Sequence, residues 1–169
     1  NHGELMHADS IHFPDSLKYQ TKKLARTVYG GGGIMPDFFV PIDTTQYTDY
    51  HRNIVAKGVV IKTTMKFIES HRKELQSKYK KFETFNDKFE ISDEILANMQ
   101  TLAEQEKIKF DEKQYQKSLP LIKTQLKALI ARDLWDMNEY FQIMNTTDSS
   151  VLQALKVLNE GAYEKVVRL

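Results

Sequence analysis

Turn-forming residues gather in the first 43 positions of the chain, and this asymmetry constrains the fold more than any other feature of the sequence. Pro14, Pro36, Pro41 and the glycine run at 30–33 all precede Thr44. They separate short stretches rich in aromatic and β-branched residues, at 17–21, 26–29 and 38–40. Such stretches between turn signals are typical of β-strands. After Thr44 glycine nearly vanishes and apolar residues recur at helical spacing. We therefore predict a mostly α chain, with N-terminal strands and turns over 1–43 and a helical C-terminal domain of about five helices over 44–169.

Capping residues predict where these helices begin and end. Gly58 supplies a left-handed stop for a first helix that opens at Thr44 or Thr45, and Ser92 with the acids after it opens a third helix. Pro120 is placed in the first turn of the fourth and longest helix, where its missing amide costs nothing. The expected helices cover about 44–57, 59–79, 92–107 and 119–145, and a short last one opens at 148 or 149. The segment 82–89 fits either a helical face or an irregular packed connection.

Composition narrows the chemistry that the chain can carry. It has no cysteine, which excludes disulfides, thiolate zinc sites and cysteine nucleophiles. The formal net charge is +1, so global charge favours neither nucleic acid nor an anionic membrane surface as a partner. No apolar run approaches the roughly 18 residues that a membrane-spanning helix needs. The first residues, NHGELMHADSIHF, lack an initiator methionine and a signal-peptide pattern, so we expect the chain to be the interior part of a longer protein.

The glycine run at 30–33 invites comparison with a phosphate-binding loop. Such a loop needs a following helix whose N-terminal amides point at the anion. Here Pro36 biases Met35 toward extended geometry, and residues 38–40 have no helical character. We therefore expect these glycines to permit a positive φ where a strand bends or another backbone approaches closely, and we expect no cofactor.

The residues around this run resemble a known family. Lys18-Tyr19-Gln20-Thr21 is followed by Arg26-Thr27-Val28-Tyr29-Gly30-Gly31-Gly32-Gly33-Ile34 and then by Pro36-Asp37. This order resembles the region after the catalytic lysine in the carboxy-terminal processing peptidases, the tail-specific serine proteases. The motif residues of the resemblance are Arg26, Gly30, Gly31, Gly32, Gly33, Ile34, Pro36 and Asp37. Residues 130–132 with Trp135 are similar to the helical tail of a subset of Gram-negative bacterial members.

The chain departs from this family pattern at one visible position. Where the family has glycine before the arginine, this chain has Ala25. If that position needs a left-handed conformation, alanine costs about 1 kcal/mol there. The turn 22–25 is then expected to differ in shape from the family's.

The resemblance implies a serine endopeptidase, a hydrolase that cuts proteins near their C-termini with a serine nucleophile and a lysine base. In the family both of these residues precede the glycine motif, so the resemblance implies no catalytic residue in this chain. Residues 1–43 would be the last strands of the catalytic α/β domain. Residues 44–169 would be a helical accessory domain that docks on the catalytic domain or self-associates. Protein or peptide substrates and a periplasmic or cell-envelope location are implied as well; the alternative is a non-enzymatic helical protein-interaction module.

The serines of the chain lack the setting of a reactive centre. Ser70 and Lys73 have a Ser-x-x-Lys spacing, but their basic surroundings on a helix indicate a solvated face. Ser16 and Lys18 would share one face of a strand, with no oxyanion-hole candidate nearby. Ser118 is interpreted as a helix cap.

Histidines and basic residues offer two further alternatives. His2, His7 and His12 recur at a spacing that suits neither a helix face nor a strand face, so we expect a polar surface segment and no metal site. Basic residues outnumber acidic ones between 57 and 88, as phosphate contacts would require. The aromatic residues in this segment are Phe67, Tyr79, Phe82 and Phe85. Their spacing fits the buried stripe of a helix better than a surface on which bases stack, so we expect no nucleic-acid partner.

A pairing hypothesis concerns Arg26 and Asp37. A tight turn centred on Gly31 and Gly32 would set these two residues opposite each other, as a cross-strand ion pair worth a few tenths to about 1 kcal/mol. A rival geometry puts the hairpin at 22–25 and makes the glycines a bend.

Overall fold

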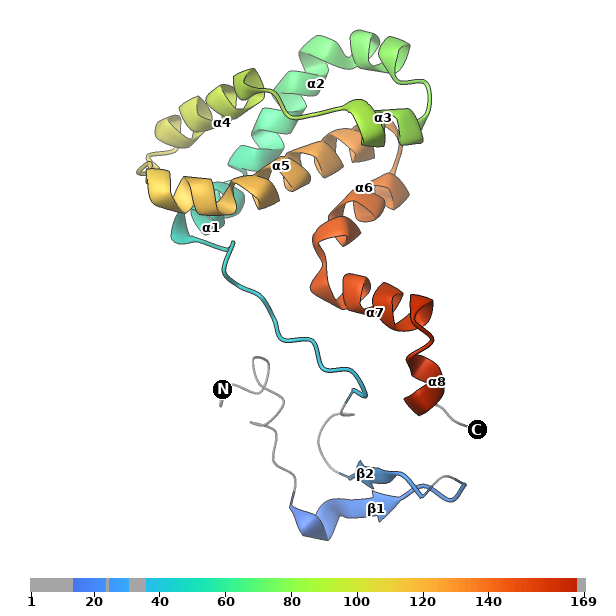
Figure 1. Ribbon diagram of the computed structural model, residues 1–169. Helices are drawn as coiled ribbons and strands as arrows, with labels where there is room; N and C mark the ends of the chain where they lie inside the picture. Colours follow the sequence, from blue (N-terminus) through green and yellow to red (C-terminus); the bar gives the residue numbers. More distant parts are fainter. Residues whose placement is uncertain (1–13, 24, 31–35, 167–169) are drawn as a thin grey trace. The chain divides into compact units, whose positions relative to one another are not determined.

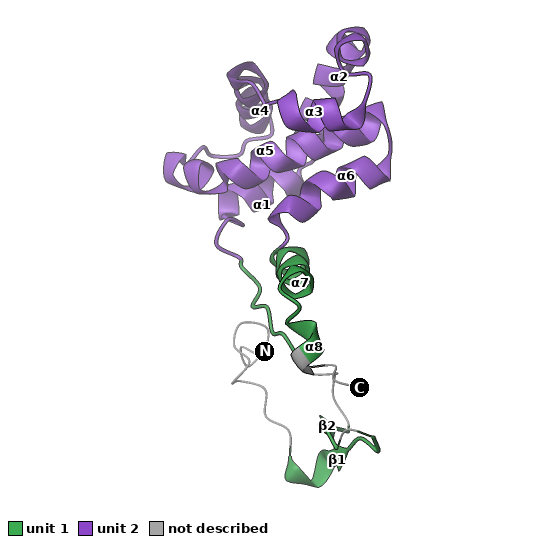
Figure 2. Ribbon diagram, turned by 45° about the vertical axis from the view of Figure 1, so that its right-hand side comes forward, with its two compact units in different colours: residues 1–43, 149–169 green, residues 44–148 purple. Residues whose placement is uncertain are grey.

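The computed structural model describes residues 14–23, 25–30 and 36–166. In this part of the chain most residues are helical, and the strands form a short two-stranded sheet near the N-terminus (Figure 1). The predicted fold class is therefore confirmed. The chain divides into two compact units, residues 44–148 and residues 1–43 with 149–169 (Figure 2). The unit 44–148 begins at the residue where we expected the helical domain to begin. Residues 149–169, which we expected in the same domain, are grouped with the N-terminal residues instead.

Residues 44–148, which we call the helical unit, are arranged around one long helix. The helices are α1 (Asp49–Ala56), α2 (Val59–Lys78), α3 (Phe82–Lys88), α4 (Asp93–Gln105), α5 (Glu112–Leu134) and α6 (Met137–Met144), followed by the 3-10 turn η3 (Asn145–Thr147). Helix α5 packs against α1, α2 and α6, and α2 also packs against α4. Figure 1 shows α5 running through the middle of this unit.

The helical unit has a hydrophobic core of its own. The buried cluster extends along the sequence from Tyr50 to Ile143, and Phe85 and Leu126 are among its fully buried side chains. Trp135 packs against Phe85, with ring centroids 5.3 Å apart. Burying apolar surface is the main stabilising term in folding, at about 25 cal/mol per Å². Because the whole cluster lies between 44 and 148, this unit contains the apolar contacts that fold it.

Two caps match the prediction and one does not. Ser92 caps α4 by accepting a hydrogen bond from the Ile95 amide, and Gly58 lies between α1 and α2 with a φ of 69°. Helix α1, however, begins at Asp49 and not near Thr44, because Thr48 is its cap and accepts a hydrogen bond from the backbone N–H of the third helical residue at 3.2 Å. The segment 82–89, left open by the sequence, is mostly helix α3.

The prediction for Pro120 is wrong. It lies well inside α5, which begins at Glu112 after the cap Asp111. Asp111 accepts a hydrogen bond from the Gln114 amide at 2.9 Å. Proline within a helix leaves the carbonyl four residues earlier without its partner. Here that carbonyl belongs to the exposed residue Gln116, where water can satisfy it.

The single helix predicted for 119–145 is two helices. Helix α5 ends at Leu134, and α6 begins after the cap Asp136. The Asp136 side chain accepts a hydrogen bond from the Asn138 amide at 2.6 Å, and the Glu139 side chain accepts one from the Asp136 amide at 3.2 Å. This reciprocal capping box satisfies amides that a new helix would otherwise leave unpaired, and so it stabilises the break.

A polar seam, formed by Gln46, Thr48, Tyr50, Gln114 and Ser118, joins the start of the helical unit to α5. The Ser118 hydroxyl is fully buried, lies 2.7 Å from the Thr48 hydroxyl and donates to the Gln46 carbonyl at 2.6 Å. The Gln114 side chain accepts a hydrogen bond from the Tyr50 amide at 2.8 Å. The interpretation of Ser118 as a helix cap is therefore wrong.

The other unit contains a short hairpin and two helices in its described residues. A 3-10 turn, η2 (Asp15–Leu17), leads into β1 (Lys18–Gln20), and β1 pairs antiparallel with β2 (Thr27–Tyr29). Two helices follow the helical unit, α7 (Ser149–Asn159) and α8 (Tyr163–Val166). Residues 38–40, predicted as a strand, are irregular, because a strand needs a pairing partner and the described chain supplies none for them.

Candidate functional site

The hairpin β1–β2 and its ends carry two residues of the motif on which the resemblance rests, Arg26 in the turn and Gly30 directly after β2. Lys18 pairs with Tyr29, Tyr19 with Val28 and Gln20 with Thr27, so the hairpin turn lies at 21–26. A hairpin turn is therefore present where the rival geometry placed it, at 22–25. The turn predicted at Gly31 and Gly32 would join residues 26–29 to 34–37, and it lies outside the described residues. Of the motif residues, Gly31, Gly32, Gly33 and Ile34 lie outside the described residues.

Ala25 adopts the conformation that the family pattern suggested. Its φ is 48°, in the left-handed region where residues other than glycine are strained. Thr21 closes the turn around it: the Thr21 carbonyl accepts a hydrogen bond from the Ala25 amide at 3.0 Å, and the Thr21 hydroxyl accepts one from the Arg26 amide at 3.0 Å. The turn thus keeps a glycine-type geometry without glycine.

Arg26 and Asp37 form the expected ion pair. Both side chains remain a little under half exposed, at 42% and 44%. Exposed pairs of this kind contribute about 0–1 kcal/mol. The pair connects Arg26, which directly precedes β2, to the Pro36-Asp37 element.

Gly30 has a steric reason to be glycine. Its amide donates a hydrogen bond to the Leu17 carbonyl at 2.8 Å, which extends the pairing beyond β2. A Cβ atom at this position would lie 3.0 Å from Cε2 of the Tyr19 ring. The close neighbour at Gly30 is therefore a side chain, and not the backbone that we predicted for this run.

The candidate serines have no activating partner in the described structure. The Ser70 hydroxyl donates to the Lys66 carbonyl at 3.3 Å, and Lys73 is exposed on the same helix. Ser16 lies in the turn η2 and not in a strand with Lys18. The Ser118 hydroxyl is hydrogen-bonded within the polar seam. A serine becomes a nucleophile when a base accepts its proton, and none of these geometries provides that contact.

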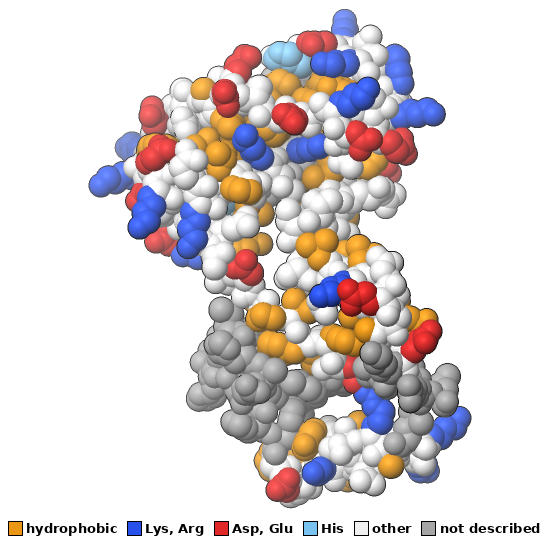
Figure 3. Space-filling model, in the orientation of Figure 1, with side chains coloured by type: hydrophobic (Ala, Val, Ile, Leu, Met, Phe, Trp, Pro, Cys, Tyr) orange, Lys and Arg blue, Asp and Glu red, His pale blue; other side chains and the backbone are white. Residues whose placement is uncertain are grey.

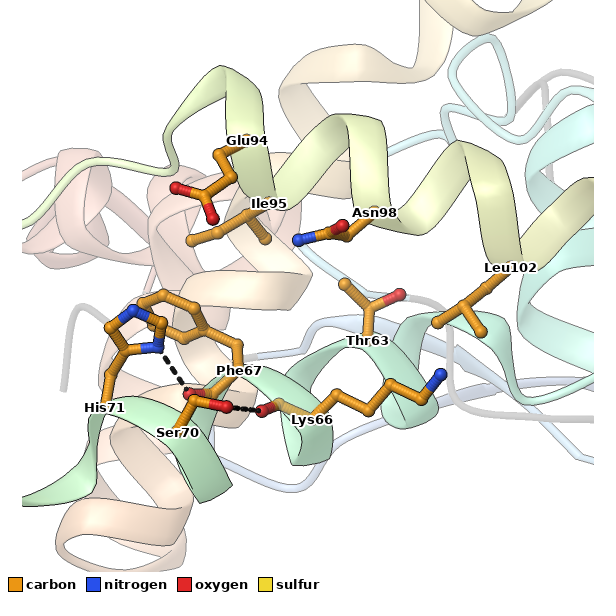
Figure 4. Close-up of a pocket in the computed structure, with 9 residues that line it drawn as sticks. All are labelled: Thr63, Lys66, Phe67, Ser70, His71, Glu94, Ile95, Asn98 and Leu102. Atoms are coloured by element: carbon orange, nitrogen blue, oxygen red, sulfur yellow. Dashed lines mark hydrogen bonds between the residues drawn. The ribbon is translucent and has the colours of Figure 1, made fainter.

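A pocket of about 230 Å³ lies between α2 and α4, next to Ser70 (Figure 4). Figure 4 shows Glu94 and Asn98 of α4 across the pocket from Phe67 and His71 of α2. The His71 ring stacks on Phe67 with centroids 4.5 Å apart, and its Nδ1 donates to the Phe67 carbonyl at 2.9 Å. This contact fixes the ring and leaves Nε2 for other partners. The pocket offers groups that can bind a small polar ligand, without a nucleophile among them.

A second pocket, of about 510 Å³, lies between the end of α3, α5 and the end of α6. Its polar lining includes Lys123 and Lys127 on α5 and Glu90 on the connection from α3 to α4. The Lys127 ammonium donates to the Asn86 carbonyl at 2.6 Å. Burial lowers the pKa of Lys127, while Glu90 and Asp87 oppose that shift. The sequence alone did not point to Lys123 and Lys127, because two lysines one helical turn apart are their only local signal.

The aromatic residues among the basic segment 57–88 are mainly core residues, as predicted. Tyr79, Phe82 and Phe85 are buried, and Phe67 is half-buried. Acidic and basic side chains are interspersed over the face of the helical unit shown in Figure 3. Some are paired: Lys62 lies 2.6 Å from Glu106, and Arg72 pairs with Asp133.

No group of three or more histidine, aspartate and glutamate side chains in the described part of the chain could hold a metal ion, and His2, His7 and His12 lie outside this part. None of the described helices has the length and apolarity needed to cross a bilayer.

The fold and pockets define an α-helical domain with its own core, joined to a small motif-bearing hairpin. The chain belongs to a family of unknown function (DUF8443), whose model matches residues 50–136, more than half of the chain. The matched range extends from the start of α1 to the capping residue Asp136, so it covers the central packing of the helical unit. No curated protein and no solved structure matches the chain.

Proposed function

We propose that this chain is the C-terminal portion of a serine endopeptidase of the carboxy-terminal processing type. The serine and lysine that hydrolyse the peptide bond would lie in polypeptide outside this chain, and residues 1–43 would complete the sheet of that catalytic domain. The chain itself would supply strands and a helical accessory domain, without catalytic residues.

The observation that carries the proposal is the exposed hairpin. Every residue of β1 and β2 is exposed, including Tyr19 at 58% and Val28 at 44%. An isolated two-stranded hairpin is marginally stable in water and needs further strands or a packing partner. Exposed strand edges and aromatic side chains of this kind are suited to pairing with other strands. The missing polypeptide of a catalytic domain would provide that partner.

The geometry of Ala25 gives secondary support. The resemblance placed a family glycine at this position, and the backbone there is left-handed. A strained non-glycine residue persists where surrounding structure holds it in place. We attribute that constraint to the sheet which the hairpin would join.

On this proposal, the parent protein acts in the periplasm or cell envelope of a Gram-negative bacterium. Its substrates are proteins or peptides cut near their C-termini. The helical unit docks on the catalytic domain or on a second copy of the protein. A non-enzymatic interaction module is the alternative, and the self-contained core of the helical unit favours it, since such a unit can act without a protease.

Casein hydrolysis tests the proposal. We expect the full parent protein to cleave casein and to be inactivated by a serine-directed reagent, whereas the chain 1–169 alone leaves casein intact. Cleavage by the chain alone would show a reactive centre here, and a parent protein without reagent-sensitive hydrolysis would favour the interaction module.

A further inference from the structure

We propose that the pocket between α3, α5 and α6 binds a single carboxylate attached to an apolar group. This inference concerns the helical unit and does not depend on the proposed peptidase function. The pocket volume of about 510 Å³ falls within the range of small-molecule sites, roughly 300–1,000 Å³.

The basic wall of the pocket has unused hydrogen-bonding capacity. Lys123 and Lys127 lie one turn apart on α5, and in the described chain neither has a carboxylate oxygen within 4.0 Å. The Lys127 ammonium gives one hydrogen bond to the Asn86 carbonyl, which leaves two of its three donors. Two like charges at this spacing on a helix destabilise each other. A bound anion would remove that repulsion and use the free donors.

Apolar residues supply the rest of the recognition surface. Phe89, Ile91 and Ile143 line the same pocket and are otherwise buried in the core. The two threonines of the pocket already donate their hydroxyl hydrogens to backbone carbonyls, Thr124 to Pro120 and Thr146 to Ile143. Recognition of negative charge therefore falls to the lysines, and an apolar group beside the carboxylate would contact the aromatic and aliphatic side chains.

Glu90 limits the negative charge that a ligand of this pocket can carry. It lines the pocket with the two lysines, so the three formal charges sum to one positive charge. A single carboxylate matches this charge, whereas a doubly charged phosphate would leave an excess of negative charge next to Glu90. Glu90 also competes with the ligand for Lys127, whose charged form its field favours.

Titration of the whole chain with N-acetyl-leucine, with binding measured from the changes in amide chemical shifts, tests the proposal. We expect N-acetyl-leucine to shift signals of 86–91 and 123–146 and to bind about tenfold more tightly than N-acetyl-leucinamide, which lacks the charge. The affinities of hexanoate and of a peptide ending in leucine are compared as well. Tighter binding of hexanoate indicates a small-molecule acid as the source of the carboxylate, and tighter binding of the peptide indicates a protein C-terminus. Equal binding of acid and amide, or no binding of either, would overturn the proposal.

Three variants test whether the ligand binds in this pocket. Lys123→Gln should weaken N-acetyl-leucine binding about tenfold, because it removes a charged donor. Glu90→Gln should strengthen it, because it removes the competing carboxylate. Lys117→Gln, an exposed lysine elsewhere on α5, is the matched control and should leave the affinity unchanged. An equal loss in Lys117→Gln and Lys123→Gln, or a weaker complex in Glu90→Gln with the fold intact, would refute this placement.

Discussion

Tyr50 is a buried residue whose hydroxyl has no hydrogen-bond partner in the described structure. It is 2% exposed, and its ring packs edge-on against Tyr115 and Phe110. Burial, with smaller contributions from Tyr115 and Glu104, raises the Tyr50 pKa to about 12. The folded state therefore keeps the proton above pH 10, where the unfolded chain loses it. The Tyr50 contribution to stability is therefore unchanged below about pH 10 and is lost as the pH rises from about 10 to about 12, at a cost on the order of 1–3 kcal/mol.

The substitution Tyr50→Phe should remove this alkaline loss. At neutral pH we expect the free energy of unfolding to stay the same or to rise by up to about 1 kcal/mol, because an unpaired buried hydroxyl is removed. Urea denaturation of both proteins from pH 7 to pH 12 measures the effect. Tyr47→Phe, which removes an exposed hydroxyl from the same unit, is the matched control. A marked loss of stability in Tyr50→Phe at neutral pH would show that the hydroxyl has a partner.

At the scale of elements, the break between α5 and α6 depends on the capping box at Asp136. Asp136→Ala should lower the free energy of unfolding by about 1 kcal/mol, because the first amides of α6 lose their acceptor. Asp136→Asn is the matched control, since asparagine caps helices about as well as aspartate. Urea denaturation should therefore separate the two variants, and equal stability of both would mean that packing around Trp135 alone fixes the break.

At the scale of the whole molecule, the buried cluster lies wholly within residues 44–148. We expect a protein of residues 44–148 to unfold cooperatively, with a free energy of unfolding within about 1 kcal/mol of the value that the helical signal gives for the full chain. Circular dichroism during urea denaturation measures both. Loss of a cooperative transition in the shorter protein would contradict a self-contained core.

The helices could be predicted from the sequence because their signals are local. Periodicity and the caps Gly58 and Ser92 were sufficient for α2 and α4. The Asp136 capping box is also a local signal. Apolar residues continue at helical spacing on both sides of Trp135, however, and so the sequence was interpreted as one continuous helix. The hairpin turn at 21–26 contains no glycine and leaves a weak local turn signal, so the sequence offered it only as one of two alternatives.

The candidate sites were less accessible to sequence reasoning because they depend on distant contacts. Ser118 meets Gln46 and Thr48, and Lys127 meets Asn86, only after the helices have packed. Neither contact leaves a pattern in the neighbouring sequence. A left-handed conformation at Ala25, in contrast, was one of the geometries that the sequence raised, because a glycine there in the family that the motif resembles has a direct backbone meaning.

The polar seam has a mechanical consequence. Tension that enters the helical unit along the backbone from Asp43 reaches Gln46 and Thr48 before the first turn of α1, and both are tied there to Ser118. Ser118 lies on α5, so part of the load passes to the longest helix of the unit as well as along α1. An attachment of this kind distributes a pull on the preceding segment over two helices of the packed domain.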